Sequence, residues 1–297
     1  MSRPKGLTPN ASLFDTRDRA RRAFGLVFAT LCFLSTVIGI VFLVILLGDI
    51  WRDGASRLTP EFLAGTPSRF ADRSGIKPAL FGSLWTLVLT ALVAFPLGVG
   101  TAIWLEEYAH NNWFTRLVQT NIANLAGVPS IVYGILGLAV FVRVFSLGYS
   151  ILAGAFTLAL LILPVIIIAS QEAIKAIPNS TRLGAYALGA TRWETVRHQV
   201  LPQAMPGILT GTILALSRAI GEAAPMILIG AVAFTGFVPR SPLDSFTVIP
   251  IQIYNWVSKP QSAFQEVAAA ASIVLLIVLL TLNAAAILLR NRYSRRS

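Results

Sequence analysis

Long apolar runs separated by short polar segments dominate the chain. A membrane-spanning helix needs about 20 apolar residues, because each residue adds about 1.5 Å to its length. Six segments reach that length: residues 24–48, 79–105, 123–145, 150–170, 207–235 and 267–289. The pattern therefore predicts an all-α membrane protein with six transmembrane helices.

The composition agrees with a chain that is mostly surrounded by lipid. Hydrophobic residues make up 55% and charged residues 12%, against about 25% charged residues in an ordinary soluble domain. The first apolar segment follows a basic stretch, as in a signal peptide, but it exceeds the usual length of about 7 to 15 residues. No small-residue cleavage pattern follows it, so we expect a retained helix.

The basic residues predict an orientation, because cytoplasmic loops hold the excess of Lys and Arg. With the N-terminus inside, the cytoplasmic segments carry 15 basic residues and the segments on the other side carry 7. Both termini are therefore predicted to be cytoplasmic. The net charge of +11 gathers in tails and loops, which favours anionic membrane lipid over nucleic acid as a partner.

The same pattern predicts the domain organisation. Its parts are a basic tail (1–23), a first helix with an external loop (24–78), a transmembrane domain (79–290) and a second basic tail (291–297). Within the domain, residues 171–206 form a long cytoplasmic loop. We expect three helical pieces there, separated by Pro178 and Gly189 and ended by Pro202, so that the loop is a compact knob.

Two charges lie in the fifth apolar segment, Arg218 and Glu222. Each costs about 2.5 to 3.5 kcal/mol at the bilayer centre, whereas Leu or Ile returns only about 0.3 to 0.6 kcal/mol. Their i, i+4 spacing lets them pair on one helical face, so one reading is a neutralised pair that only orders the bundle. A solute path is favoured, because ionisable groups inside membranes are functional by default.

The residues around this pair also favour a solute path. Gly221 clears space beside the charges, and Pro225 leaves the Gly221 carbonyl without its helical donor. Arginine matches a tetrahedral oxyanion with its fork of donors, but a lone glutamate repels an anion. Phosphate near neutral pH keeps a P–OH proton that can bond to Glu222, and fully ionised sulfate does not. The pair is therefore interpreted, as a hypothesis, as a phosphate filter.

The long loop also carries an unusual surface. Trp193 stands between Arg192 and Glu194, and Trp and Arg are enriched at interface hot spots. A solvated amphipathic surface is the plainer reading, but docking of a cytoplasmic partner is favoured. Neither His110 nor His198 has partners at metal-ligand spacing.

The segment LGAYALGATRWETVRHQVLP resembles the EAA loop of ABC importer permeases. That pattern is EAA, three residues, Gly, then an apolar residue and Leu-Pro about ten positions on. Leu183 stands where the family has its acid, Gly184 replaces the first alanine, and Gln199 replaces the apolar residue. The resemblance implies eight residues for coupling to an ATPase: Ala185, Gly189, Ala190, Thr191, Arg192, Trp193, Leu201 and Pro202.

The resemblance narrows with residues 75–109, 124–138, 217–226 and 246–260. In that shared order they are similar to the phosphate-specific permease of the PstA type, and the likeness covers about residues 75–290. It implies a type I (MetI-like) ABC importer permease bundle in the bacterial inner membrane. It also implies that Arg218 and Glu222 lie on the phosphate path.

The chain lacks an ATP-binding loop of its own, because it has no GxxxxGK[ST] motif and no Gly-Lys dipeptide. We therefore expect no cofactor and no enzyme activity in this chain, with ATP and Mg held by partner subunits. The resemblance implies a second permease (PstC type), two ATP-binding subunits (PstB type) and a phosphate-binding protein (PstS type).

Two other functions stay open. A sulfate or molybdate permease shares the loop, but the buried acid argues against it. An integral membrane transferase needs a catalytic group at a membrane face, where Glu106, Glu107 and His110 are the only candidates. These three have no convergent partners in the sequence, so a loop role beside the headgroups is favoured.

Overall fold

The computed structural model describes residues 11–231 and 235–294, and every regular element in those ranges is a helix. The chain divides into two units, Met1–Arg52 and Asp53–Ser297. The boundary between the units falls inside residues 24–78, which were predicted to form the first helix with its external loop. Each unit is described by itself.

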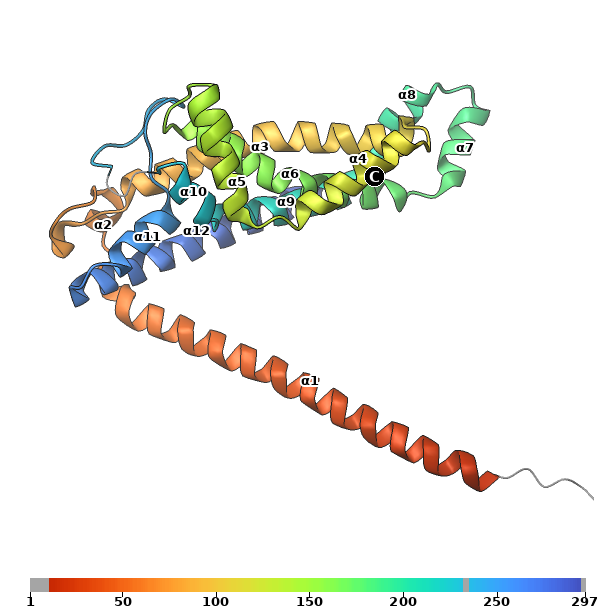
Figure 1. Cartoon of the computed structure of the whole chain (residues 1–297), viewed down its shortest axis with the longest axis horizontal. Helices are drawn as coiled ribbons and strands as arrows, with labels where there is room; N and C mark the ends of the chain where they lie inside the picture. The colour runs from red at the N-terminus through yellow and green to blue at the C-terminus, as the bar shows by residue number, and fades with distance from the viewer. Residues whose placement is uncertain (1–10, 232–234, 295–297) are drawn as a thin grey trace, which may run out of the picture. The chain divides into compact units, whose positions relative to one another are not determined.

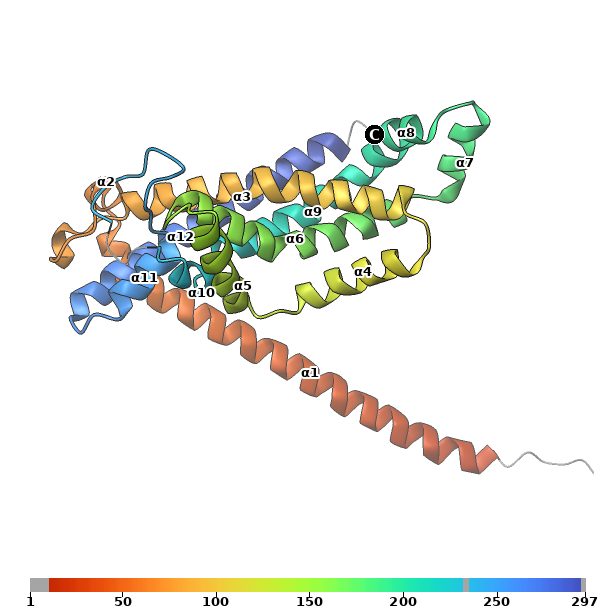
Figure 2. The same cartoon turned by 45° about the horizontal axis from the view of Figure 1, so that its top comes forward.

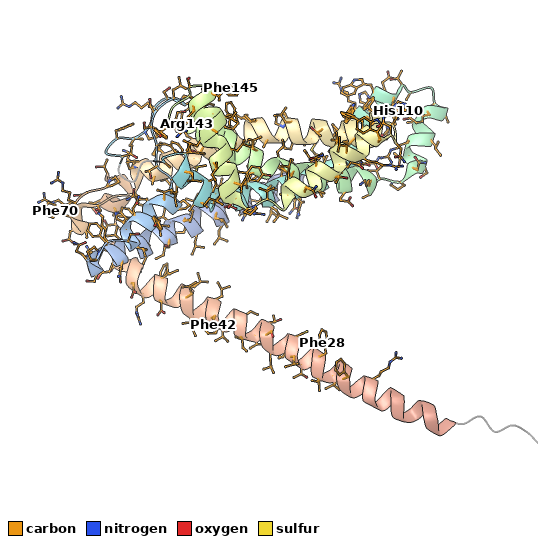
Figure 3. The ribbon with its side chains drawn as sticks, viewed as in Figure 1. Phe28, Phe42, Phe70, His110, Arg143 and Phe145 are labelled. Carbon is orange, nitrogen blue, oxygen red and sulfur yellow. The ribbon has the colours of Figure 1, made fainter. Side chains whose placement is uncertain are left out.

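The first unit consists of helix α1, which spans Ala11–Gly54 and continues two residues into the second unit. The predicted span 24–48 lies entirely within it. From Phe24 to Leu47 its large apolar side chains are exposed, and Phe28 and Phe42 stand out from the ribbon in Figure 3. A helix that is apolar all round suits lipid rather than water.

The second unit is a bundle of helices (Figure 1). Its helices are α2 (Pro60–Ala64), α3 (Lys77–Ile103), α4 (Trp113–Ala126), α5 (Ser130–Gly137), α6 (Ile151–Lys175), α7 (Asn179–Ala187), α8 (Arg192–Thr195), α9 (Leu201–Ile220), α10 (Ala224–Leu228), α11 (Ile249–Val257) and α12 (Ser262–Ser294). Three π-helical segments continue α3, α5 and α8: Trp104–Tyr108, Leu138–Val144 and Val196–Val200.

Helix α6 forms the centre of the bundle, with α3 and α9 packed against it (Figure 2). Small residues allow these helices to approach closely. A Cβ atom on Gly98 of α3 would lie 2.6 Å from the side chain of Ile166, and one on Gly211 of α9 would lie 2.3 Å from that of Ala169. Larger side chains at either glycine would therefore push α6 away from its neighbours.

The described residues contain five helices long and apolar enough to cross a membrane, or up to six if a bent pair counts as one span. The predicted third span, 123–145, corresponds to this pair but includes only the last four residues of α4, and it is not one straight helix. Helices α4 and α5 meet at 105°, with the break at Gly127–Pro129. Pro129 lacks a backbone donor and disfavours helical geometry at the residue before it, which accounts for the break.

The predicted fifth span, 207–235, is not one continuous helix, and its residues 232–234 lie outside the described residues. Helix α9 stops at Ile220, and the helix that contains it begins at Arg192 and runs through Pro202 instead of ending there. The π-helical segment directly before Leu201 shifts the hydrogen bonding to a wider spacing, which accommodates a proline.

The two ends of the bundle differ. One end carries α7, α8 and His110, and the other carries α2, α11 and Arg143 (Figures 1 and 3). We call them the α7 end and the α11 end. Arg143 is exposed near the end of its helical segment, as expected for a side chain that reaches outward.

Candidate functional site

The two charges predicted to lie mid-span stand on either side of a helix break. Arg218 is in the last turn of α9, and Glu222 follows the last residue, Ile220. The amide of Gly221 donates to the carbonyl of Arg218 at 3.1 Å, and that of Glu222 donates to Ala219 at 3.2 Å. These tighter bonds end the helix, and Pro225 then occupies the first turn of α10, where it needs no donor.

Arg218 and Glu222 form the ion pair that their spacing predicts. The Nε atom of Arg218 lies 3.2 Å from Oε1 of Glu222. The arginine side chain is 58% exposed in this chain, whereas the glutamate side chain is 16% exposed. The pair therefore joins a carboxylate at the edge of the bundle interior to a guanidinium on its surface.

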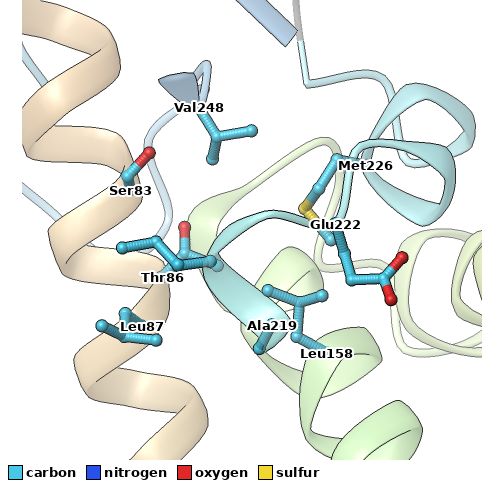
Figure 4. A pocket seen from close by; sticks show the side chains of 9 residues that line it. Ser83, Thr86, Leu87, Leu158, Ala219, Glu222, Met226 and Val248 are labelled. Carbon is cyan, nitrogen blue, oxygen red and sulfur yellow. The ribbon is translucent and has the colours of Figure 1, made fainter. Parts of the chain in front are cut away.

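Glu222 lines a small cavity between α3, α6 and α10 (Figure 4). Ser83 and Thr86 of α3 line it on one side, with Glu222 and Met226 on the other, and in this view the carboxylate points away from the two hydroxyl groups. The free volume is about 10 Å³, which is room for about one water molecule. This cavity therefore admits no larger solute in the described conformation.

The two hydroxyl groups have defined hydrogen bonds. Ser83 Oγ accepts the amide of Ile249 at 2.9 Å, so its own proton is available to a bound group. Thr86 Oγ1 donates to the carbonyl of Gly82 at 2.7 Å, which leaves its lone pairs available. The sequence reasoning missed both residues. The sequence feature that could have revealed them is the i, i+3 spacing of their hydroxyl side chains, which places both on one face of the largely apolar segment 79–105.

A polar contact also fixes the last turn of α9. Ser217 Oγ lies 2.8 Å from the carbonyl oxygen of Ile213 and close to Oδ1 of Asn283 in α12, and these two acceptors share its single proton. Ser217 precedes Arg218, so this contact holds the backbone beside the ion pair against α12.

The predicted helical knob is present at the α7 end. Gly189 has φ of +86° and separates α7 from α8, a conformation that glycine adopts without the cost that a Cβ atom brings. Thr191 starts α8 with a capping box, in which its side chain accepts the Glu194 amide and its own amide donates to the Glu194 carboxylate at 2.8 Å.

The other predicted coupling residues fall into two groups. Ala185 and Ala190 are half-buried and joined by a backbone hydrogen bond of 3.1 Å, whereas Arg192 and Trp193 are exposed. Leu201 and Pro202 lie in the long helix instead of on the knob. Their part in coupling stays a prediction.

Large apolar side chains are exposed on the knob. Leu183, which stands where the EAA pattern has its acid, is 60% exposed, and Leu188 is 91% exposed. Together with Trp193 they form what we call the knob apolar set. Apolar residues exposed together at the end of a helical loop indicate an interaction site.

The expectation that Glu106 and Glu107 have no convergent partners is wrong. The side chain of Glu107 is 4% exposed and pairs with Arg182 of α7, 75 residues further on, with 2.6 Å between Arg182 Nη2 and Glu107 Oε1. Breaking a buried pair on one side costs about 3 to 5 kcal/mol. The acids of this segment therefore hold the bundle together.

A bundle of helices long and apolar enough to span a membrane, interrupted beside a charged pair and carrying a helical knob at one end, is typical of the transmembrane subunit of a transporter. The family described as "Binding-protein-dependent transport system inner membrane component" matches residues 94–297, and the chain belongs to this family.

Relatives of known name agree with that assignment. The chain is 37% identical to the "Probable ABC transporter permease protein YqgI" of Bacillus subtilis (strain 168), over 68% of this chain and 73% of the relative. It is 33% identical to the "Phosphate transport system permease protein PstA 1" of Mycobacterium tuberculosis (strain CDC 1551 / Oshkosh), over 91% of this chain and 90% of the relative.

The fold is shared with solved importer structures. One chain of a bacterial ABC transporter involved in the import of the acidic polysaccharide alginate superposes with a TM-score of 0.61 at 17% identity. The match covers 95% of this chain and 99% of the other. The chain is thus a multi-pass membrane protein with the fold of an ABC importer permease, a class that works with a second permease, ATPase subunits and a substrate-binding protein.

Proposed function

We propose that this chain is the permease subunit of an ATP-driven importer of inorganic phosphate. The observation that carries the proposal is the pair of Arg218 and Glu222 at the break after α9, with Glu222 lining a cavity that Ser83 and Thr86 share. The naming of a relative that matches 91% of the chain as a phosphate permease supports the same substrate.

The chemistry of the pair suits an anion that still carries a proton. The guanidinium of Arg218 donates to the phosphate oxygens, and the P–OH group donates to the carboxylate of Glu222. Ser83 supplies a further donor from α3. Sulfate has no proton for Glu222 at neutral pH, so the carboxylate repels it. The selectivity therefore depends on one hydrogen bond that only the protonated anion makes.

Transport requires the cavity beside Glu222 to open in turn to each face. At about 10 Å³ it is too small for phosphate, so the anion enters only after the cavity widens, as an alternating-access cycle requires. The exposed face of Arg218 is where the second permease, of the PstC type, completes the path. A phosphate-binding protein of the PstS type delivers the anion from the opposite side.

The energy comes from two ATP-binding subunits of the PstB type, which hold the ATP and Mg. In this proposal the α7 end lies in the cytoplasm, and both chain termini lie there as well, in the bacterial inner membrane. The knob apolar set docks on an ATPase subunit. Because Leu183 replaces the acid of the EAA pattern, this contact is apolar instead of ionic.

The test is phosphate uptake by the four-component complex in lipid vesicles, with ATP supplied on the knob side. Uptake should require ATP and the binding protein, and Arg218→Ala should reduce it about tenfold or more, the equivalent of about 1.4 kcal/mol. Arg143→Ala, at an exposed arginine of the α11 end, is the matched control and should leave uptake unchanged. Full uptake by Arg218→Ala, or uptake of sulfate in place of phosphate, contradicts the proposal.

A further inference from the structure

Three consecutive residues at the end of α3 each hold a different part of the α7 end. Glu106 accepts a hydrogen bond from Gln171 of α6 at 2.7 Å, and Glu107 pairs with Arg182 of α7. The third residue, Tyr108, lies under the guanidinium of Arg192 at the start of α8, 5.3 Å from its ring centre. A single π-helical segment, Trp104–Tyr108, therefore joins the end of α3 to the whole knob.

The central contact of this set is multivalent and buried. The guanidinium of Arg182 donates through Nε and Nη2 to Glu107 Oε1, at 3.1 and 2.6 Å. It also donates to the carbonyl of Ile174 in the last turn of α6 at 3.1 Å, and to that of Ile177, two residues after α6, at 2.8 Å. One side chain of α7 thus binds the last turn of α6 and the end of α3 together. A planar fork with several fixed partners leaves little freedom for α7 to move alone.

Helix α3 connects this contact to the cavity at Glu222. Ser83 and Thr86 line that cavity, and Glu107 stands 24 residues after Ser83, which corresponds to about 36 Å along a helix. The helix packs tightly on α6 at Gly98 and Ile166. A displacement of α7 therefore reaches both helices at once, and α3 carries it toward the cavity.

We propose that the Glu107–Arg182 pair is the positioning link that passes movement of the knob to α3 and so opens the cavity beside Glu222. The proposal rests on the proposed transport function, because it assumes that ATPase subunits displace the knob. The pair lies inside the chain, whereas the position of the family's acid on the knob is occupied by Leu183. A pair that only caps α6 would affect stability and leave coupling intact.

The first experiment measures phosphate taken up per ATP hydrolysed by the reconstituted complex. Glu107→Gln and Arg182→Gln should each lower this ratio about tenfold, within the range typical of coupling between sites, while ATP hydrolysis stays within about twofold. The double variant leaves no unpaired buried charge and should be no worse than either single variant, since both changes break one link. The control is Glu172→Gln, an exposed acid at the same end that should leave the ratio unchanged.

A second experiment uses no phosphate. In a Cys32→Ser background, the rate at which a membrane-impermeant thiol reagent labels Ser83→Cys should change when a non-hydrolysable ATP analogue is added. With Arg182→Gln present, that nucleotide dependence should be lost. Because the labelling rate does not depend on the transported anion, this experiment still tests the link between the knob and the cavity if the phosphate assignment fails.

Two results overturn the link. One is an unchanged ratio of phosphate to ATP in an assembled double variant, which shows that the pair only stabilises the fold. The other is nucleotide-dependent labelling of Ser83→Cys that persists in Arg182→Gln. If a single variant fails to assemble because a buried charge is left unpaired, the double variant decides.

Discussion

The Nε atom of Arg218 lies 3.2 Å from the Oε1 atom of Glu222, across the point where α9 ends. A helix that stops between two charges exposes backbone groups beside them, and such irregular backbone is tolerated at membrane depth only inside protein or beside a water-filled cavity. The break therefore supports a solute path more strongly than the charges do alone.

The carboxylate should decide between phosphate and sulfate. In Glu222→Gln the side chain keeps its size and loses its charge, so sulfate is no longer repelled and the charged hydrogen bond to P–OH is lost. Such a bond is worth about 1.5 to 3 kcal/mol, which corresponds to a roughly tenfold to hundredfold change in the preference for phosphate. Competition between the two anions in vesicle uptake measures it, and an unchanged preference would contradict the filter.

The knob apolar set should bind an ATPase subunit through its leucines. Leu183→Asp or Leu188→Asp places a charge where an apolar contact is expected, and burial of one leucine contributes about 1.5 to 3 kcal/mol. Affinity for the ATPase subunit should fall about tenfold or more in a titration with purified components. Leu63→Asp, at an exposed leucine of the α11 end, is the control and should bind normally.

The turn at Gly189 should resist substitution. Its φ of +86° is unfavourable for any residue with a Cβ atom, at a cost of about 1 to 2 kcal/mol for Gly189→Ala. Gly184→Ala lies inside α7 and meets no neighbour within 4 Å, so it should instead stabilise the helix by about 0.5 to 1 kcal/mol. Amide hydrogen exchange across α7 and α8 measures both effects, and equal changes in the two variants would argue against this account of the turn.

Acid should loosen the loop that precedes α11. Amides of Arg240 and Ser241 donate to the Asp244 carboxylate and hold its pKa below the ordinary value. The carboxylate therefore contributes stability above its ordinary pKa, and this contribution is lost as the pH falls through the lowered value. Hydrogen exchange at Arg240 and Ser241 should accelerate in that acidic range beyond the intrinsic trend. The variant Asp244→Asn should not show that acceleration.

Sequence reasoning located the spans because hydropathy reports burial in lipid directly. It placed the end of the fifth span incorrectly, because the residues after Glu222 are as apolar as those before Arg218. Hydropathy does not distinguish a continuous helix from two that meet at a turn. The combination of Gly221 and Pro225 indicates the end of α9, where the sequence analysis expects only a free carbonyl at Gly221 within a continuous helix.

Pairing across the fold was harder to predict than local structure. The break at Gly189 follows from neighbouring residues, and it appears in the structure as a helix boundary. Glu107 and Arg182 are 75 residues apart and belong to different predicted segments. Only the packing of α3 against α6 brings them together, so neither periodicity nor composition gave a reason to connect them.

The space beside Glu222 admits about one water molecule. If the chain transports phosphate as proposed, a cell that has concentrated this anion must prevent its escape between transport cycles. A space of this size does not admit the anion, so none flows back past Glu222 until the cavity widens, and retaining the store at this point consumes no ATP.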